Sequence, residues 1–277
     1  YKVGRRCRRQ LRAHARRSQV SDTGLKVWRL GLWGVRRYVF GRPERKYMAN
    51  GGAIIAVVGG DGAGKSTAVD ALYTLLSKDF ATIKLHLGKP TWCWTTFPLK
   101  GLLKVGRWLG VFSNRKVSVR SLAKAPSSDF PGYAWVLWHV LTARDRYHAY
   151  LKARRFATNG GVVICDRYPL PQIRFMDGGQ TCHLVTARGT KRLLNFLIGR
   201  EQKFYQQILP PDVLIVLKVE PEIAVERRPD EEAEWVRNRC QEIGEFDWQQ
   251  TSAQLIDAGK PKAEALVELK SLVWSKL

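Results

Sequence analysis

Short apolar runs alternate along the chain with longer segments whose apolar residues recur every three or four positions. Five runs predict strands, and they are 53–58, 82–87, 161–165, 212–219 and 254–257. Helical spacing is found over 65–77, 133–157 and 262–275. Continuously apolar, β-branched runs are typical of strands that are buried on both faces of a parallel sheet. The pattern therefore predicts an α/β fold, with a doubly wound parallel sheet of about five strands and flanking helices.

Two segments depart from this alternation. Residues 88–131 combine four prolines with several tryptophans and many basic residues, which predicts an irregular or partly helical insertion. Residues 1–50 contain 15 Lys and Arg against two acids. We therefore divide the chain into a basic, partly amphipathic helical segment, 1–50, and an α/β domain, 51–277.

The basic segment accounts for more than half of the formal net charge of +23. Over residues 24–40, apolar and basic side chains alternate at a spacing that predicts an amphipathic helix. Such a helix could dock its Trp and Leu face on the core of this protein, or it could lie on an anionic membrane surface. A surplus of positive charge also attracts other polyanions, including nucleic acid and phosphorylated substrates.

The apolar runs and the cysteines indicate in which compartment the protein is expected. No apolar run approaches the roughly 18 residues that a membrane-spanning helix needs. The five cysteines are scattered, odd in number and without a CxxC pair, which favours free thiols in a reducing compartment over disulfides or a zinc site. We therefore expect a cytoplasmic protein, with peripheral membrane binding through residues 1–50 as the alternative.

The most specific motif is the sequence GGDGAGKST, which follows the first predicted strand and opens the first predicted helix. It satisfies GxxxxGK[ST], the pattern of a phosphate-binding P-loop (Walker A). Glycines let backbone N–H groups surround a phosphate at a helix N-terminus. Lys65 would reach the β- and γ-phosphates of ATP or a similar nucleotide, and the Ser66 hydroxyl would bind Mg²⁺. The predicted nucleotide-binding residues are Gly59, Gly60, Gly62, Ala63, Gly64, Lys65, Ser66 and Thr67.

Other P-loop classes fit less well. The chain has no NKxD motif, by which GTPases read guanine, and no LSGGQ-type signature of ABC ATPases. Three further stretches resemble those of the thymidylate kinase-like family of P-loop nucleotide kinases, as does the P-loop itself. They are TARDRYH at 142–148, VVICDRY at 162–168, and PDVLIVLKV at 211–219 with the acidic and basic residues that follow it. The resemblance extends from about residue 53 to residue 275.

This resemblance implies roles for several residues. Asp61 would hydrogen-bond the sugar of the acceptor, and Arg146 would also contact the acceptor. Asp166 would hold Mg²⁺ through water, and Arg167 would bind the acceptor phosphate. A lid at 227–245 would stabilise charge on the transferred group and exclude water. Its candidate arginines are Arg227, Arg228, Arg237 and Arg239, and the catalytic set is Lys65, Asp61, Asp166, Arg167 and Arg228.

Structural alternatives exist for these charged residues. The lid arginines could form a solvated charge run with Glu231, Glu232 and Glu234. Asp166 and Arg167 could be a surface ion pair at a strand end. Asp145 falls on the apolar stripe of its helix, where an unpaired carboxylate would be costly, so we expect it to pair with an arginine.

The acceptor half departs from the family pattern. The usual Arg-Glu-Pro segment is replaced by His86-Leu87-Gly88-Lys89-Pro90, which leaves Lys89 as the substitute for binding the acceptor phosphate. Thr142 stands where an aromatic ring would stack on thymine. The resemblance thus implies a homodimeric, ATP- and Mg²⁺-dependent kinase of nucleotide biosynthesis, with a nucleoside monophosphate as acceptor and dTMP as first candidate. The alternatives are a kinase of a sugar or lipid-linked glycan, or a non-catalytic nucleotide-binding protein docked by its basic N-terminus.

Overall fold

The computed structural model describes residues 23–28, 30–32, 45–88, 101, 132–170, 173, 178–181, 184 and 192–277. The chain forms two units, Tyr1–Arg45 and Lys46–Leu277. The second unit begins before the predicted boundary at residue 51, because Lys46 forms a parallel bridge with Phe80 and the Met48 N–H donates to the Gly160 carbonyl at 2.9 Å. Of the predicted insertion at 88–131, only residues 88 and 101 are among those described.

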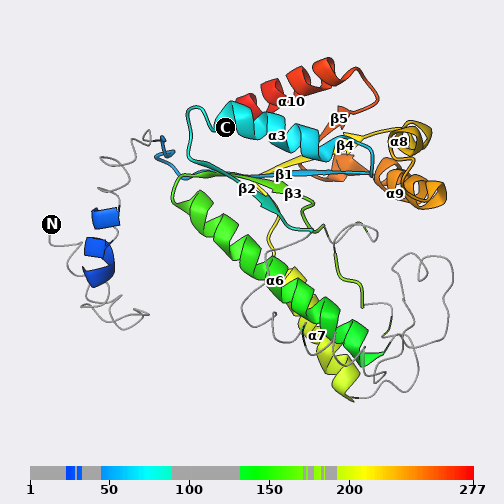
Figure 1. Ribbon diagram of the computed structural model, residues 1–277, viewed down its shortest axis with the longest axis horizontal. Coiled ribbons are helices and arrows are strands. Elements are labelled where there is room, and N and C mark those ends of the chain that lie inside the picture. Colours follow the sequence, from blue (N-terminus) through cyan, green and yellow to red (C-terminus); the bar gives the residue numbers. More distant parts are fainter. Residues whose placement is uncertain are drawn as a thin grey trace. The chain divides into compact units, whose positions relative to one another are not determined.

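Five parallel strands form one sheet, in the order β2-β3-β1-β4-β5 (Figure 1). Their bounds are β1 Ile54–Gly59, β2 Thr82–His86, β3 Val162–Asp166, β4 Val213–Lys218 and β5 Ala253–Asp257. The predicted fold class and all five predicted strands are confirmed. Strands β2 and β3 lie on one side of β1, and β4 and β5 lie on the other, so the loop after β1 is at the switch point of the sheet, where ligands of such folds bind.

Helices cover both faces of the sheet. On one face, α3 (Lys65–Leu76) and α10 (Lys262–Lys276) pack on alternate strand residues such as Ile55, Val57 and Ile215. On the other face, α6 (Tyr133–Thr158) packs on the intervening residues, including Ile54 and Ala56. Figure 1 shows α3 and α10 above the sheet and α6 below it. This is the doubly wound arrangement that the sequence predicted.

Three helices complete the described part of the larger unit. Helix α7 (Arg192–Gln206), which the sequence analysis did not predict, runs beside α6 and shares with it a cluster of Val136, Val140, Leu194 and Ile198. Helices α8 (Pro221–Arg227) and α9 (Ala233–Glu245) follow β4 and contain most of the predicted lid. A 3₁₀ turn, η3 (Trp248–Gln250), leads to β5.

In the basic segment, residues 23–28 and 30–32 are helical. Leu25 is half-buried, whereas Trp28 and Leu30 are each 65% exposed and Leu32 is 40% exposed. The other residues of the predicted amphipathic helix lie outside the described part of the chain. Among the described residues, no helix combines the length and apolarity that crossing a bilayer requires.

Candidate functional site

The phosphate loop connects the central strand β1 to helix α3. Gly64 precedes the first helical residue and has a φ of 79°, a left-handed conformation that favours glycine. Gly60 is required for a different reason, since a Cβ at this position would lie 2.5 Å from the Cys240 sulfur on α9. The loop is therefore shaped by its own glycines and held against α9.

Lys65 folds back over the loop. Its Nζ donates to the carbonyls of Gly59 at 3.1 Å and Gly60 at 2.6 Å, and the residue is 7% exposed. Burial lowers the pKa of the Lys65 ammonium to about 8, although the nearby Asp61 carboxylate opposes the shift. The predicted phosphate-binding lysine is thus a buried cation that donates to carbonyls of its own loop. To bind a phosphate, Lys65 would have to leave these carbonyls.

Asp61 is the centre of an ion cluster. Its carboxylate lies 2.7 Å from Arg239 Nη1, 3.5 Å from Arg167 Nη2 and 3.6 Å from Lys65 Nζ, and the residue is 5% exposed. Burial acts to raise the pKa of this carboxyl, but Arg239, followed by the other cations, holds it below its ordinary value. The predicted contact with the acceptor sugar stays a prediction, because the carboxylate here faces cations of the protein.

The end of β3 has two unusual features. Asp166 Oδ1 is buried and has no hydrogen-bond partner among the described residues, while Oδ2 lies 3.8 Å from His86 Nε2. Arg167 has a φ of 55°, and it is the single non-glycine residue of the described chain in the left-handed region. Strain of this kind is concentrated at functional sites, where surrounding contacts maintain it.

The residues predicted for Mg²⁺ suit an ion that is held largely by phosphate and water. The Ser66 hydroxyl is exposed at the start of α3, and the unpartnered Asp166 oxygen needs a donor or a cation. Among the described residues there is no group of three or more His, Cys, Asp or Glu that could hold a metal by itself. Mg²⁺ commonly takes one or two protein ligands and completes its shell with water and substrate phosphates.

Arg146 is an anchor between elements. It is 6% exposed, and its guanidinium donates to the Leu87 carbonyl at 3.0 Å, the Gly88 carbonyl at 3.2 Å and the Tyr205 hydroxyl at 2.6 Å. In this geometry Arg146 fixes the backbone at the end of β2, and the predicted contact with the acceptor stays a prediction. Lys89, the other predicted acceptor ligand on this side, lies outside the described residues.

The ion pairs near this site separate structural from functional candidates. Asp145 pairs with Arg144 at 3.5 Å, as the sequence analysis expected. Arg228, the lid arginine predicted for catalysis, pairs with Asp230 and Glu231, and Arg237 pairs with Glu222 through two 3.0 Å contacts. Arg228 thus pairs with one acid of the predicted charge run, Glu231, whereas the partner of Arg237 is Glu222, which lies outside that run.

The remaining two lid candidates contact the phosphate loop. Arg227 donates to the Gly62 carbonyl at 3.4 Å and to the Ala258 carbonyl at 2.9 Å. Arg239 binds Asp61 from α9. The structure thus brings Lys65, Asp61, Arg167 and Arg239 together, whereas Arg228 pairs with Asp230 and Glu231 of the lid and Arg237 pairs with Glu222 on α8.

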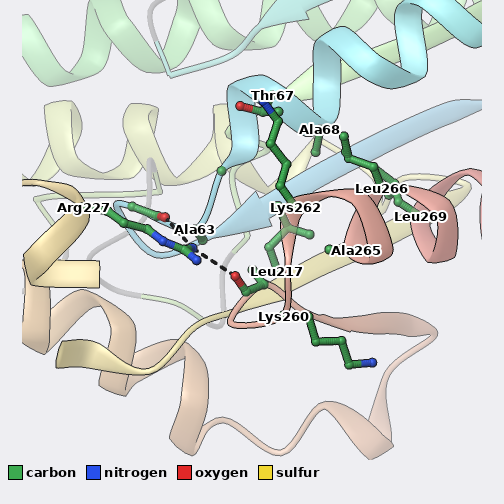
Figure 2. Close-up of a pocket in the computed structure, with 13 residues that line it drawn as sticks. Ala63, Thr67, Ala68, Leu217, Arg227, Lys260, Lys262, Ala265, Leu266 and Leu269 are labelled. Carbon is green, nitrogen blue, oxygen red and sulfur yellow. Dashed lines mark hydrogen bonds between the residues drawn. The ribbon is translucent and has the colours of Figure 1, made fainter. Parts of the chain in front are cut away.

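A pocket of about 290 Å³ adjoins the phosphate loop between α3 and α10 (Figure 2). Its wall is mainly apolar, and its polar side chains come from Thr67, Arg227, Lys260 and Lys262. Of these four, the sequence analysis named Thr67 as a ligand and Arg227 as a lid candidate. It missed the pocket itself, because the pocket depends on how α10 packs against α3, which no local motif encodes.

Comparisons with known proteins show which proteins this chain resembles. No family model matches it. "Uncharacterized ATP-binding protein YghR" of Escherichia coli K12 is 28% identical over 236 residues, which cover 83% of this chain and 89% of the relative. "Uncharacterized ATP-binding protein YghS" of the same strain is 30% identical over 187 residues, 64% of this chain and 73% of the relative. The structure of thymidylate kinase from Candida albicans aligns with a TM-score of 0.49 at 17% identity, covering 81% of this chain and 92% of that one. With its P-loop at the switch point of a five-stranded parallel sheet, this chain belongs to the family of YghR and YghS.

Proposed function

We propose that this protein is an ATP- and Mg²⁺-dependent phosphotransferase of the P-loop kinase type. The observation that carries the proposal is the convergence of Lys65, Arg167 and Arg239 on the phosphate loop, with an apolar pocket beside it. Three cations from three elements suit the charge that develops during phosphoryl transfer. The relatives YghR and YghS carry ATP-binding in their names, which supports a nucleotide as donor.

The nucleotide would lie across the two parts of the site. The apolar pocket suits a purine base, since small-ligand sites are mainly apolar clefts of roughly 300 Å³ or more. The triphosphate would extend from there to the backbone N–H groups of the loop and the N-terminus of α3. Arg227 joins the parts, because it holds both the Gly62 carbonyl of the loop and the Ala258 carbonyl of the pocket.

The chain's own residues would supply most of the catalysis by positioning and electrostatics. Lys65 would leave the loop carbonyls to bind the β- and γ-phosphates, and Arg167 and Arg239 would stabilise the transferred group. Ser66 and Asp166 would hold the metal. When bound, Mg²⁺ neutralises part of the phosphate charge.

The acceptor that we test first is a nucleoside monophosphate, dTMP, which would approach at the ends of β2 and β3. The family resemblance in the sequence supports this choice, and so does the position of Arg167 at the end of β3, where its side chain is 31% exposed. A hydroxyl of a sugar or lipid-linked glycan is the alternative acceptor, because the thymidylate-specific positions of the sequence are altered.

The test is ADP release by the purified full-length chain with Mg²⁺ and ATP, alone and with dTMP, dUMP or a glycan extract. We expect acceptor-dependent turnover that falls at least about 100-fold in Lys65→Met. The matched control is Arg155→Ala, which removes an exposed arginine at the C-terminal end of α6 and should leave turnover unchanged. ATP binding that is insensitive to Lys65→Met would contradict the proposal, whereas turnover with a glycan alone would reassign the acceptor.

A second candidate function belongs to the basic segment, for which we propose binding to an anionic lipid surface. Val27, Trp28 and Leu30 are each 65% exposed, in a segment with 15 Lys and Arg among its 50 residues. Basic residues near an anionic leaflet contribute about 1 kcal/mol each, and apolar side chains add insertion energy. Full-length protein should sediment with phosphatidylglycerol vesicles at low salt and much less with phosphatidylcholine, and Trp28→Ser with Leu30→Ser should weaken this binding. Equal sedimentation with both lipids would refute it.

A further inference from the structure

We propose that Asp61 is an internal competitor of phosphate, whose carboxylate neutralises the cations of the phosphate site until a substrate phosphate takes Arg239 from it. The inference rests on the proposed phosphotransfer function and deepens it. It assigns Asp61 as a positioning residue for cations, and it assigns Arg239 as the lid arginine that binds the transferred or accepting phosphate.

The first support is the geometry of the cluster. Arg239 Nη1 and Asp61 Oδ2 are 2.7 Å apart, and both side chains are less than a tenth exposed. Lys65 and Arg167 approach the other carboxylate oxygen at 3.6 and 3.5 Å. These cations come from α3, the end of β3 and α9, so the loop carboxylate is the common ligand that holds three separate elements in one place.

The second support is the charge balance. Three cations lie within 3.6 Å of one carboxylate, which leaves an excess of two positive charges, and a fourth cation, Arg228, is paired with Asp230 and Glu231. Asp166 is close enough for its charge to raise the pKa of Lys65, and counting it still leaves an excess of one. A buried surplus of positive charge is costly, and a phosphate would relieve it. The acids named here, which come from the part of the chain that the structure describes, are therefore fewer than the cations.

The third support is Arg239 itself. Its Nε is buried and has no hydrogen-bond partner among the described residues, while Nη1 is held by Asp61. The guanidinium carbon lies 5.8 Å from the centre of the Trp235 ring, which supports one side of the group. A buried donor without a partner is unfavourable. A tetrahedral phosphate could accept from Nε and Nη2, which share one edge of the guanidinium, as Arg237 does with the Glu222 carboxylate.

The competing explanation is that Asp61 serves the acceptor sugar, as the family resemblance implies. The two explanations predict different phosphate affinities for Asp61→Asn, which keeps the size of the side chain and removes its charge. A sugar ligand would lose acceptor affinity and leave phosphate binding unchanged. An internal competitor would release Arg239, Arg167 and Lys65, so phosphate would bind more tightly.

The experiment measures the dissociation constants of inorganic phosphate and of Mg²⁺–ATP, without acceptor, by calorimetry on the full-length chain. We expect Asp61→Asn to bind inorganic phosphate about tenfold more tightly than the original chain, which corresponds to about 1.4 kcal/mol. The matched control is Asp70→Asn, which removes an exposed carboxylate from α3 that pairs with Lys84 at 2.7 Å. The control should leave phosphate affinity unchanged.

A second variant assigns the effect to Arg239 and does not require Asp61→Asn to fold. We expect Arg239→Gln to weaken phosphate binding about tenfold, and we expect the gain from Asp61→Asn to disappear when both changes are combined. Unchanged phosphate affinity in Arg239→Gln would overturn the assignment of Arg239. Unchanged or weaker phosphate binding in folded Asp61→Asn would overturn the competition.

These outcomes are separable from those of the proposed function. If ATP binds and its binding depends on Lys65, while Asp61→Asn gains no phosphate affinity, the inference fails and the phosphotransferase proposal stands. If the original chain binds neither ATP nor phosphate, the proposed function fails and the inference fails with it.

Discussion

Lys65 shows how a binding residue can oppose the stability of the fold. Its pKa of about 8 lies below the ordinary 10.5, so the unfolded chain holds this proton more tightly than the folded one. Between pH 8 and 10.5 the unfolded state binds more protons, and the free energy of unfolding therefore rises with pH in this window. Below pH 8 the full cost of burying the ammonium is present.

Lys65→Met removes that cost and keeps the length of the side chain. At pH 7 we expect the free energy of unfolding to increase by about 1–3 kcal/mol, as judged from the lowered pKa. The gain should shrink toward pH 10 in urea denaturation, even though ATP binding is lost at every pH. A variant that is less stable than the original chain at pH 7 would show that contacts of Lys65 with the loop outweigh its desolvation.

The backbone of Arg167 is strained. Its φ of 55° is a conformation that glycine adopts freely and that other residues adopt at a cost. Arg167→Gly and Arg167→Ala both remove the side chain and its contact with Asp61, so their difference isolates the backbone. We expect the glycine variant to be about 1 kcal/mol more stable in urea denaturation, the reverse of the order at ordinary positions. An alanine variant of equal or greater stability would mean that the loop relaxes.

At the scale of elements, the sequence predicted those strands and helices whose positions depend on their own residues. The strands and the helices α3, α6 and α10 lie within one or two residues of their predicted positions, because buried parallel strands must be apolar throughout and a P-loop must join a strand to a helix. Helix α7 was missed even though its apolar residues, among them Leu194, Leu197 and Ile198, recur at the spacing of an amphipathic helix.

Some residues of the site could be predicted from a local motif, and others could not. The loop residues follow from a contiguous motif, whereas the pairing of Asp61 with Arg239 joins positions 178 apart in sequence. The sequence could not distinguish Arg239 from Arg228 or Arg237, since all three lie in one basic and acidic stretch. The packing of α9 makes that distinction for two of them, because it buries Arg239 and leaves Arg237 exposed, whereas Arg228 lies at the end of α8 and pairs with Asp230 and Glu231.

Arg146 provides a test at the scale of elements. Its three donors join α6 to the end of β2 and to Tyr205 on α7. Arg146→Gln should lower the free energy of unfolding by about 2–4 kcal/mol, because two carbonyls and a hydroxyl lose a charged donor. The smaller change Tyr205→Phe removes one acceptor and should cost about 1 kcal/mol. Unchanged stability together with a raised acceptor KM would instead make Arg146 a direct acceptor ligand.

At the scale of the whole molecule, the lid is part of the core as well as part of the site. Helix α9 buries Val236 and Cys240 against α8, and it contributes Ile243 to the large cluster on one face of the sheet. The same helix presents Arg239 to the phosphate loop. The position of this arginine is therefore set by packing beneath the loop, where Gly60 and Cys240 meet.

The contact between Gly60 and Cys240 can be tested by enlarging the first residue and reducing the second. In Gly60→Ala the new Cβ would lie 2.5 Å from the Cys240 sulfur, so we expect a loss of about 1–3 kcal/mol in stability and a displaced Arg239 that weakens phosphate binding. Adding Cys240→Ala removes the sulfur, and the nearest remaining atoms are then the Cα and Cβ of residue 240, at 3.3 and 3.5 Å. The double variant should recover both stability and phosphate affinity relative to Gly60→Ala, as measured by denaturation and calorimetry. Recovery of stability without recovery of affinity would mean that the loop glycine serves the phosphate directly, and that the packing of α9 does not control the position of Arg239.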